Sequence, residues 1–352
     1  MKIAIVSPVM IEVPPKKYGG IELMVTNLAL GLADRGHKIT IFCAGGSSLK
    51  HKNIKLVKST PYPTYDRLNE NRRWEAKEIL EVLGKQDDFD LIHFFYEPKI
   101  FEFPVDGGML NLLQFFRKPL VVTFSNTTAI SENITYYQKN QKEFSQIAKI
   151  FISERQRSHL EFLNKAQVIY NGIEVEKYKF EKQKNGYLFF LGRISKDKGI
   201  LEAIEVAKKT KHKLVIAARI SPVDQEFYEQ KVKPLIDGKE IKYIGEINFK
   251  NKVAWLAGAK ALVFPIKWEE PFGLVVTEAF ACGTPVLTTR FGSMPEIIKN
   301  GYNGFISENI GEMIKQVGEL DEIKPANCRS SALEFSSQKM VADHEKLYLK
   351  ML

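Results

Sequence analysis

The segment from residue 262 to residue 286 constrains the fold of this chain more than any other stretch. It begins with an apolar run at residues 262–264, which is typical of a buried strand in a parallel sheet and which ends at Pro265. A loop follows, and the pattern then predicts a helix from Leu274 to Gly283. Strand, loop and helix in this order are typical of a parallel α/β domain, in which ligands bind at the carboxyl ends of the strands.

Two glutamates in this segment indicate a binding site. Glu270 lies in the loop and Glu278, eight positions later, lies in the helix, so both can face one pocket. The free backbone N–H groups at the start of the helix between them suit an anion such as a phosphate. Each carboxylate can accept two hydrogen bonds from a vicinal diol of a sugar or ribose. A nucleotide-sugar, with sugars on both sides of a diphosphate, satisfies all three requirements.

The motif Glu-Pro-Phe-Gly-Leu-x3-Glu-Ala from Glu270, followed by Gly-Thr-Pro-Val and by Gly292-x2-Pro295-Glu296, resembles glycosyltransferase family 4. Members of this family are retaining enzymes of GT-B architecture that use nucleotide-sugar donors. The resemblance implies that Glu270 binds hydroxyls of the donor sugar and that Glu278 binds the ribose diol. It also implies that the intervening residues line the donor site: Phe272, Gly273 and Leu274.

A glycine pair near the N-terminus points to a second anion-binding element. A predicted strand at residues 3–7 leads into Pro14-Pro15-x2-Tyr18-Gly19-Gly20, and a helix is predicted from Ile21. Glycines directly before a helix let the backbone approach a bulky anion, although a tight turn alone would also explain them. This opening is similar to that of many family 4 members, which implies that Gly19 and Gly20 contact the donor diphosphate.

Two cations repeat this arrangement in the second half of the chain. Arg193 and Lys198 lie five positions apart in Gly192-Arg193-x4-Lys198-Gly199, between a predicted strand and a predicted helix at residues 200–210. Both can therefore bind one pyrophosphate, and they would stabilise the charge that grows on the departing nucleotide. An isolated arginine and lysine are more often solvated surface charges, but the setting resembles the diphosphate-binding pair of the family.

Residues on the acceptor side depart from the family pattern. Family members commonly have a histidine directly after the Thr-Phe of the strand predicted at residues 120–124, whereas this chain has Ser125 and Asn126. His93 ends another predicted strand, at residues 90–95, and is either a buried structural histidine or a site residue. We assign His93, Ser125 and Asn126 to the acceptor side, with the acceptor type open.

Composition and charge exclude several classes of protein. The 352 residues are 44% hydrophobic and 26% charged, which is ordinary for a globular chain with core enough for two domains. Three widely spaced cysteines exclude a disulfide framework and a zinc-ligand spacing, and no Asp-x-Asp motif is present, so we expect no cofactor and no metal. No secretory signal and no membrane-spanning run are found, which favours a cytoplasmic protein.

The net charge of +9 suits an anionic donor, and no nucleic-acid-binding motif accompanies it. A solvated basic surface is the preferred interpretation, and peripheral contact with an anionic membrane at its inner face is the second. Residues 133–148 contain aromatic residues and lysines. This stretch is compatible with an ordinary surface element, which is preferred, or with an interfacial helix at a membrane.

The predicted fold is α/β, with two Rossmann-like, doubly wound parallel sheets in a GT-B architecture. We predict an acceptor-side domain at residues 1–172 and a donor-binding domain at residues 173–334, with a C-terminal helix at 335–352 that packs back on the first domain. The remaining predicted elements include helices over residues 67–83, 253–259, 306–320 and 330–352.

The function that follows is a bacterial-type, metal-independent, retaining hexosyltransferase that transfers a sugar from a nucleotide-sugar to an acceptor hydroxyl of a glycan, glycolipid or small molecule. One alternative is a weakly catalytic nucleotide-sugar-binding partner of an active transferase. A second is a GT-B epimerase or phosphorylase, but those lack the full Glu-x7-Glu context.

Overall fold

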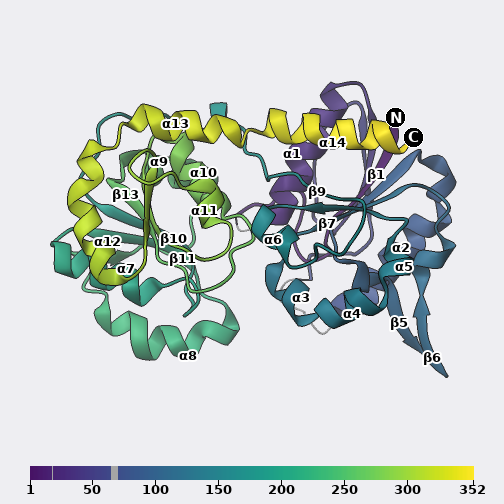
Figure 1. Ribbon diagram of the computed structural model, residues 1–352, viewed down its shortest axis with the longest axis horizontal. Coiled ribbons are helices and arrows are strands. Elements are labelled where there is room, and N and C mark those ends of the chain that lie inside the picture. Colours follow the sequence, from purple (N-terminus) through teal and green to yellow (C-terminus); the bar gives the residue numbers. More distant parts are fainter. Residues whose placement is uncertain (18, 65–69) are drawn as a thin grey trace. The chain divides into compact units, whose positions relative to one another are not determined.

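A computed structural model gives the conformation of the chain and describes residues 1–17, 19–64 and 70–352. The chain divides into two compact units, which Figure 1 shows in ribbon form. Unit 1 contains residues 1–172 and 337–352, and unit 2 contains residues 173–336. Each unit is built on one parallel sheet with helices in the connections, so the predicted fold class is confirmed.

The sheet of unit 1 has seven strands in the order β3-β2-β1-β4-β7-β8-β9, and every neighbouring pair is parallel. The chain starts at β1, builds one edge, and then returns to build the other edge from β4. The strands are β1 (Lys2–Val6), β2 (Lys38–Cys43), β3 (Ile54–Lys58), β4 (Leu91–Phe94), β7 (Leu120–Phe124), β8 (Ala148–Phe151) and β9 (Ala166–Val168). The loops after β1 and β4 therefore flank the point where the winding direction reverses, which is where open α/β sheets bind ligands.

Most helices of unit 1 lie in the connections between these strands, and the last one is the C-terminal helix of the chain. They are α1 (Gly20–Asp34), α2 (Asn71–Gly84), α3 (Thr127–Glu132), α4 (Ile134–Lys139), α5 (Gln141–Phe144), α6 (Glu154–Ser158) and α14 (Ser337–Met351). The C-terminal helix α14 packs beside α1, as Figure 1 shows. Gly31 makes this close packing possible, because a β-carbon there would lie 2.5 Å from a methyl group of Val341.

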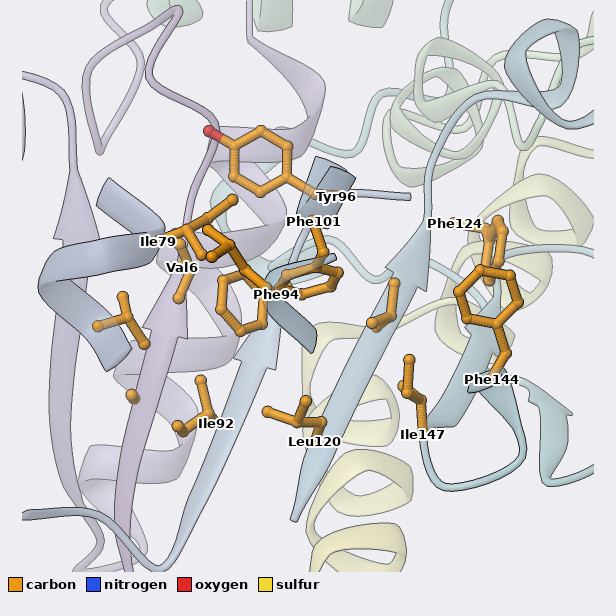
Figure 2. Close-up of a cluster of buried hydrophobic side chains, with 14 of the residues drawn as sticks. Val6, Ile79, Ile92, Phe94, Tyr96, Phe101, Leu120, Phe124, Phe144 and Ile147 are labelled. Carbon is orange, nitrogen blue, oxygen red and sulfur yellow. The ribbon is translucent and has the colours of Figure 1, made fainter. Parts of the chain in front are cut away.

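The core of unit 1 is formed by alternate residues of the central strands. Val6, Ile92 and Leu120 come from three neighbouring strands and point to the same face of the sheet, and Ile79 of α2 lies beside Val6 (Figure 2). At the other end of this cluster, Phe124 packs near Phe144 of α5. These strands are buried on both faces, so apolar residues occupy successive positions in them. The strands could be predicted from these continuous apolar runs.

The sheet of unit 2 has six parallel strands in the order β12-β11-β10-β13-β14-β15. Its strands are β10 (Leu188–Arg193), β11 (Leu214–Arg219), β12 (Ile241–Tyr243), β13 (Ala261–Phe264), β14 (Val286–Thr289) and β15 (Gly304–Ser307). Its helices are α7 (Ile200–Thr210), α8 (Gln225–Phe227), α9 (Phe249–Gly258), α10 (Leu274–Ala281), α11 (Met294–Ile297), α12 (Ile310–Gln316) and α13 (Pro325–Glu334). The reversal of winding lies between β10 and β13.

Two predicted helices need correction, and one hairpin was not predicted. Helix α2 is described from Asn71 to Gly84, and the predicted positions 67–69 lie outside the described residues, as does Tyr18 of the glycine motif. The continuous helix predicted for residues 330–352 is two helices, α13 and α14, because the chain leaves helical backbone at Phe335. The helix predicted for residues 306–320 begins only at Ile310, after strand β15. The antiparallel hairpin of β5 (Glu102–Val105) and β6 (Gly108–Asn111) was not predicted.

The stretch at residues 133–148 is a packed element. It forms the short helices α4 and α5, and the side chains of Tyr137 and Phe144 on them are fully buried. The following Lys149 is also buried, and its ammonium group donates to the carbonyl oxygens of Ile147 and Asn164, each at 2.8 Å. These aromatic residues belong to the core of unit 1, which favours the ordinary structural interpretation over an interfacial helix.

Within residues 1–17, 19–64 and 70–352, no helix combines the length and the apolar character needed to cross a bilayer. The three cysteines are free thiols, and all are buried: Cys43, Cys282 and Cys328.

Candidate functional site

The loops after β10 and β13 meet at the reversal point of the unit 2 sheet, and Lys198 and Glu270 lie on them. The ammonium group of Lys198 donates to Oε2 of Glu270 at 2.5 Å. Both side chains are largely buried, with 16% and 12% of their surface exposed. Lys198 also lies over the Trp268 ring, 4.2 Å from the ring centroid. The structure therefore brings together two residues that the sequence placed in separate motifs.

The Glu270 carboxylate is held in place by its own loop and by the loop after β14. The indole N–H of Trp268 donates to the same Oε2 at 3.0 Å, and the backbone N–H of Ser293 donates to the Glu270 carbonyl at 3.0 Å. Among the described residues, every hydrogen bond of the carboxylate involves Oε2. Oε1 is thus left to accept a ligand hydroxyl.

Two helices begin beside this pair, and a glycine with left-handed backbone precedes each of them. Gly199 (φ 71°) precedes α7 and Gly273 (φ 80°) precedes α10, and neither helix start has a side-chain cap. A β-carbon at Gly199 would lie 1.9 Å from the carbonyl oxygen of Pro265, so only glycine allows these two loops to meet. The uncapped N–H groups of α7 and α10 are available to an anion.

Arg193 ends β10 and is held loosely between two carboxylates. Its guanidinium nitrogens lie 3.5 Å from Oδ2 of Asp197 and 3.5 Å from Oδ2 of Asp224. These distances are long for charge-assisted hydrogen bonds. Burial raises the pKa of Asp224, and the positive charge of Arg193 opposes that shift. In this structure Arg193 and Lys198 have different partners, and both remain on the loop between β10 and α7.

Glu278 lies on the buried face of α10 and has two partners of its own. Oε1 accepts a hydrogen bond from the hydroxyl of Tyr178 at 2.8 Å and one from the ammonium group of Lys252 at 2.5 Å. Burial and the adjacent Glu278 charge hold the pKa of Tyr178 well above its usual value, so its phenol stays protonated. Both contacts use Oε1, and Oε2 is left for a ligand in the described part of the chain. Glu270 and Glu278 thus share no partner.

The neighbouring residues assigned to the donor site contribute in different ways. Phe272 is 1% exposed, and its ring packs edge-on against Phe335 at 5.5 Å, so its side chain belongs to the core. The Phe272 carbonyl accepts a hydrogen bond from the Ser293 hydroxyl at 2.9 Å. Phe272 can therefore line the predicted donor site with its backbone, while its ring packs in the core. Gly273 and Leu274 begin the helix and offer backbone groups only.

In unit 1, Gly19 and Gly20 form the start of α1, directly after the loop that follows β1. Gly19 has φ 149°, and a β-carbon there would lie 2.6 Å from Pro15. Glu22 in the first turn is buried, and burial raises the pKa of its carboxyl group to about 7. Glu22 was not among the predicted site residues, and its signal in the sequence is an acidic residue two positions after the glycine pair.

His93 is a packing residue in this structure. It is fully buried, and each ring nitrogen lies 2.7 Å from a hydroxyl oxygen, Nδ1 from Tyr348 and Nε2 from Thr123. Burial, with a smaller contribution from nearby His344, holds its pKa well below the usual value. Of the two interpretations of His93, these contacts favour the buried structural histidine, which links the sheet to α14.

Ser125 and Asn126 form the two-residue link between β7 and α3. Their backbone N–H groups donate to the carboxylate of Glu97, which follows β4. Burial raises the pKa of Glu97, and these two hydrogen bonds oppose the shift. Glu97 was not among the predicted site residues. Its signal was a carboxylate at the carboxyl end of a central strand, beside the reversal point.

Among the described residues, no group of three or more histidine, cysteine, aspartate or glutamate side chains is arranged to hold a metal ion. The positive groups next to Glu270 are Lys198 and the two helix starts.

Two family models match the chain. The model for Glycosyltransferase Family 4 matches residues 18–177, and the model for Glycosyl transferases group 1 matches residues 173–324. The chain belongs to glycosyltransferase family 4.

Relatives and solved structures agree with this assignment. The glycosyltransferase is 27% identical to an uncharacterized glycosyltransferase of Methanocaldococcus jannaschii, over 86% of this chain and 84% of that protein. It is 25% identical to N-acetyl-alpha-D-glucosaminyl L-malate synthase of Bacillus anthracis, over 95% of this chain and 94% of that protein. It is also similar in fold to Anabaena HepE in complex with UDP and glucose, with a TM-score of 0.76, 19% identity and full coverage of both chains. The predicted GT-B architecture is therefore confirmed.

Proposed function

We propose that this glycosyltransferase transfers a sugar from a nucleoside diphosphate-sugar to an acceptor hydroxyl, with retention of configuration at the anomeric carbon. The observation that carries the proposal is the Lys198–Glu270 pair between two uncapped helix starts. A cation and backbone donors suit a diphosphate, and a carboxylate fixed at one oxygen suits the hydroxyls of the attached sugar. That HepE is solved with UDP and glucose supports this donor class.

Lys198 can bind the diphosphate without leaving Glu270. An ammonium group has three N–H donors, and the contact with Glu270 uses one of them. Arg193 has only long contacts to Asp197 and Asp224, so its guanidinium can turn to a phosphate at little cost. As negative charge grows on the departing nucleoside diphosphate, these two cations and the helix starts stabilise the transition state. We propose that this makes a divalent metal unnecessary.

The two glutamates then have separate tasks. Oε1 of Glu270 accepts from donor-sugar hydroxyls, while Oε2 remains bound to Lys198 and Trp268. Oε2 of Glu278 accepts from the ribose, while Oε1 remains bound to Tyr178 and Lys252. In both cases one oxygen fixes the carboxylate and the other binds ligand, which limits the conformational entropy lost on binding. The contact of Gly19 and Gly20 with a diphosphate stays a prediction.

Retention in this family is attributed to attack on the same face of the sugar that the nucleotide leaves. We identify no protein nucleophile for a double displacement, and none is needed for this route. We further propose a cytoplasmic enzyme, with peripheral contact at an anionic membrane surface as a property to be tested.

Two variants test the assignments in unit 2. In Glu270→Gln, donor hydrolysis and transfer should both fall at least tenfold, because a neutral amide no longer pairs with Lys198 or orients the sugar.

In Lys198→Ala, calorimetry should show weaker binding of the bare nucleoside diphosphate as well as slower transfer. Glu269→Gln and Lys196→Ala change the same charges on the same loops and serve as controls. Wild-type behaviour of both site variants would refute the proposal.

A second candidate is a nucleotide-sugar-binding module with little catalysis, which Ser125 in place of the family histidine favours. Titration with nucleotide-sugars and a donor-consumption assay separate the two. Firm donor binding, with consumption no faster than in buffer across a panel of acceptors, would favour the module. Activity that is unaffected by EDTA would support the metal-free mechanism.

A further inference from the structure

Unit 1 contains a hollow of about 700 Å³ whose lining is basic. It lies beyond the carboxyl ends of β2 and β3 and against the first half of α2. Its volume is that of a site for a small molecule. The lining residues are Gly45, Gly46, Lys58, Thr60, Pro61, Arg73, Trp74 and Lys77.

Three of the lining side chains are cations, and none is an acid. Lys58 ends β3, and Arg73 and Lys77 lie one turn apart on α2. Within residues 1–17, 19–64 and 70–352, no carboxylate forms an ion pair with any of the three. Neighbouring surface cations differ in this respect, since Arg72 pairs with Glu75 and Lys85 pairs with Glu81. These three exposed cations give the hollow a positive potential, which attracts an anion.

Trp74 fixes the position of two of these cations. The guanidinium of Arg73 lies 5.7 Å and the ammonium of Lys77 5.4 Å from the centroid of the indole ring. The ring itself is held, because its N–H donates to Oε2 of Glu70 at 3.2 Å and Tyr62 packs against it edge-on. The Lys77 ammonium also donates to the Ser59 carbonyl at 2.8 Å. The cations are therefore oriented before any ligand binds.

The opposite wall of the hollow is closely packed backbone. Thr60 ties the loops after β2 and β3 together, because its hydroxyl accepts from the Gly45 N–H at 3.0 Å and donates to the Tyr62 carbonyl at 2.6 Å. A β-carbon at Gly45 would lie 2.2 Å from the carbonyl carbon of Pro61, so the two loops meet only because position 45 is glycine. Gly46, which is exposed, leaves the mouth of the hollow free of side chains.

We propose that this hollow binds the phosphate group of a phosphorylated compound. Arg73 offers a planar fork of donors, and Lys58 on β3 and Lys77 on α2 add two point charges, which together suit a dianion with three oxygens better than a planar carboxylate. Resting on the proposed function, the compound is the acceptor: a sugar or polyol that carries a phosphate, either as a small molecule or as a lipid headgroup. The chemistry of the bound group is the same in both cases.

Calorimetry on the full chain tests this site with four probes: inorganic phosphate, glucose 6-phosphate, glucuronate and glucose. Glucose 6-phosphate should bind most tightly, phosphate less tightly, and the other two at least tenfold more weakly than glucose 6-phosphate. The double variant Arg73→Gln/Lys77→Gln should weaken glucose 6-phosphate at least tenfold. Lys52→Gln/Lys55→Gln on the same unit should leave it unchanged, because neither residue lines the hollow. The folded state of each variant is checked by circular dichroism.

Flotation with vesicles distinguishes the two sources of the phosphate. If vesicles that contain phosphatidylinositol retain the wild type and not the Arg73/Lys77 variant, while neutral phosphatidylcholine vesicles retain neither, the source is a lipid headgroup. If only the soluble sugar phosphate binds, the source is a small molecule.

Donor binding, measured separately with nucleoside diphosphates, keeps this inference independent of the proposed function. If phosphate binding depends on Arg73 and Lys77 but no nucleoside diphosphate binds, the phosphate site is supported and the proposed transferase function is refuted. Donor binding without phosphate binding, or phosphate binding that the double variant retains, would overturn the site.

Discussion

A β-carbon placed on Gly292 would lie 2.3 Å from the backbone nitrogen of Glu270. Gly292 also has a left-handed backbone conformation, with φ 59°. The loop after β14 therefore presses directly on the loop that presents the Glu270 carboxylate, and the hydrogen bond from the next residue, Ser293, locks the two together. The position of the Glu270 backbone thus depends on residues more than twenty positions away in the sequence.

Replacement of Gly292 by alanine should displace Glu270. We expect transfer activity to fall at least tenfold and the free energy of unfolding to fall by about 2–4 kcal/mol, from strain and the clash together. Gly301→Ala is the matched control, since Gly301 has φ 72° but no atom within 4 Å of an added β-carbon. The free energy of unfolding of this control variant should fall by about 1 kcal/mol, and its transfer activity should be unchanged. Equal activity in the two variants would contradict the role of Gly292.

Tyr178→Phe should weaken the hold on Glu278. The variant removes a buried hydrogen bond to a carboxylate, which is worth about 1.5–3 kcal/mol of stability. Because Lys252 remains in place, we expect donor affinity to fall severalfold rather than to disappear. Urea unfolding and nucleotide titration measure the two effects. Tyr243→Phe removes a hydrogen bond to a backbone carbonyl on β11 and should affect donor affinity much less.

His93→Leu separates packing from a site role. The variant leaves the hydroxyls of Thr123 and Tyr348 without their buried partner, at a cost of about 1–3 kcal/mol for each group. We expect a lower melting temperature and unchanged kcat/KM at a temperature well below it. A loss of kcat/KM in a fully folded variant would return His93 to the acceptor side.

Glu78 should make stability depend on pH. It is fully buried on α2, and burial raises the pKa of its carboxyl group from an ordinary 4.5 to about 8, although the Tyr96 hydroxyl donates to it at 3.1 Å. The folded chain thus holds this proton more tightly than the unfolded chain does. The protonated Glu78 carboxyl group therefore contributes to the free energy of unfolding. This contribution is complete below the pKa of the unfolded chain and is lost as the pH rises through the pKa of the folded chain.

The comparison with Glu78→Gln measures this effect, because the amide does not titrate. Between about pH 5 and pH 8, the free energy of unfolding of the wild type, measured with urea, should fall relative to that of the variant by on the order of several kcal/mol. Glu81→Gln on the same helix, where Glu81 pairs with Lys85 at the surface, should show no such trend. A pH-independent difference between the wild type and Glu78→Gln would show that Glu78 is ionised in the folded chain.

The sequence by itself determined the parallel strands and the loops that carry the site. Strands buried on both faces are continuous apolar runs, and a glycine before a helix leaves a visible sign, so the region from β10 to α7 and the region from β13 to α10 were predictable locally. The spacing of Glu270 and Glu278 likewise identified the family, because it lies within one strand-loop-helix segment.

Only the tertiary structure decided which side chains meet. Lys198 pairs with Glu270 because β10 and β13 are neighbours on the two sides of the reversal point, which is a property of strand order and not of local sequence. Strand order likewise placed Thr123 next to His93, and the return of α14 placed Tyr348 there, so His93 became a packing residue. Hydrogen bonds between residues far apart in the chain depend on how elements pack, and the periodicity of a single element carries no information about its neighbour.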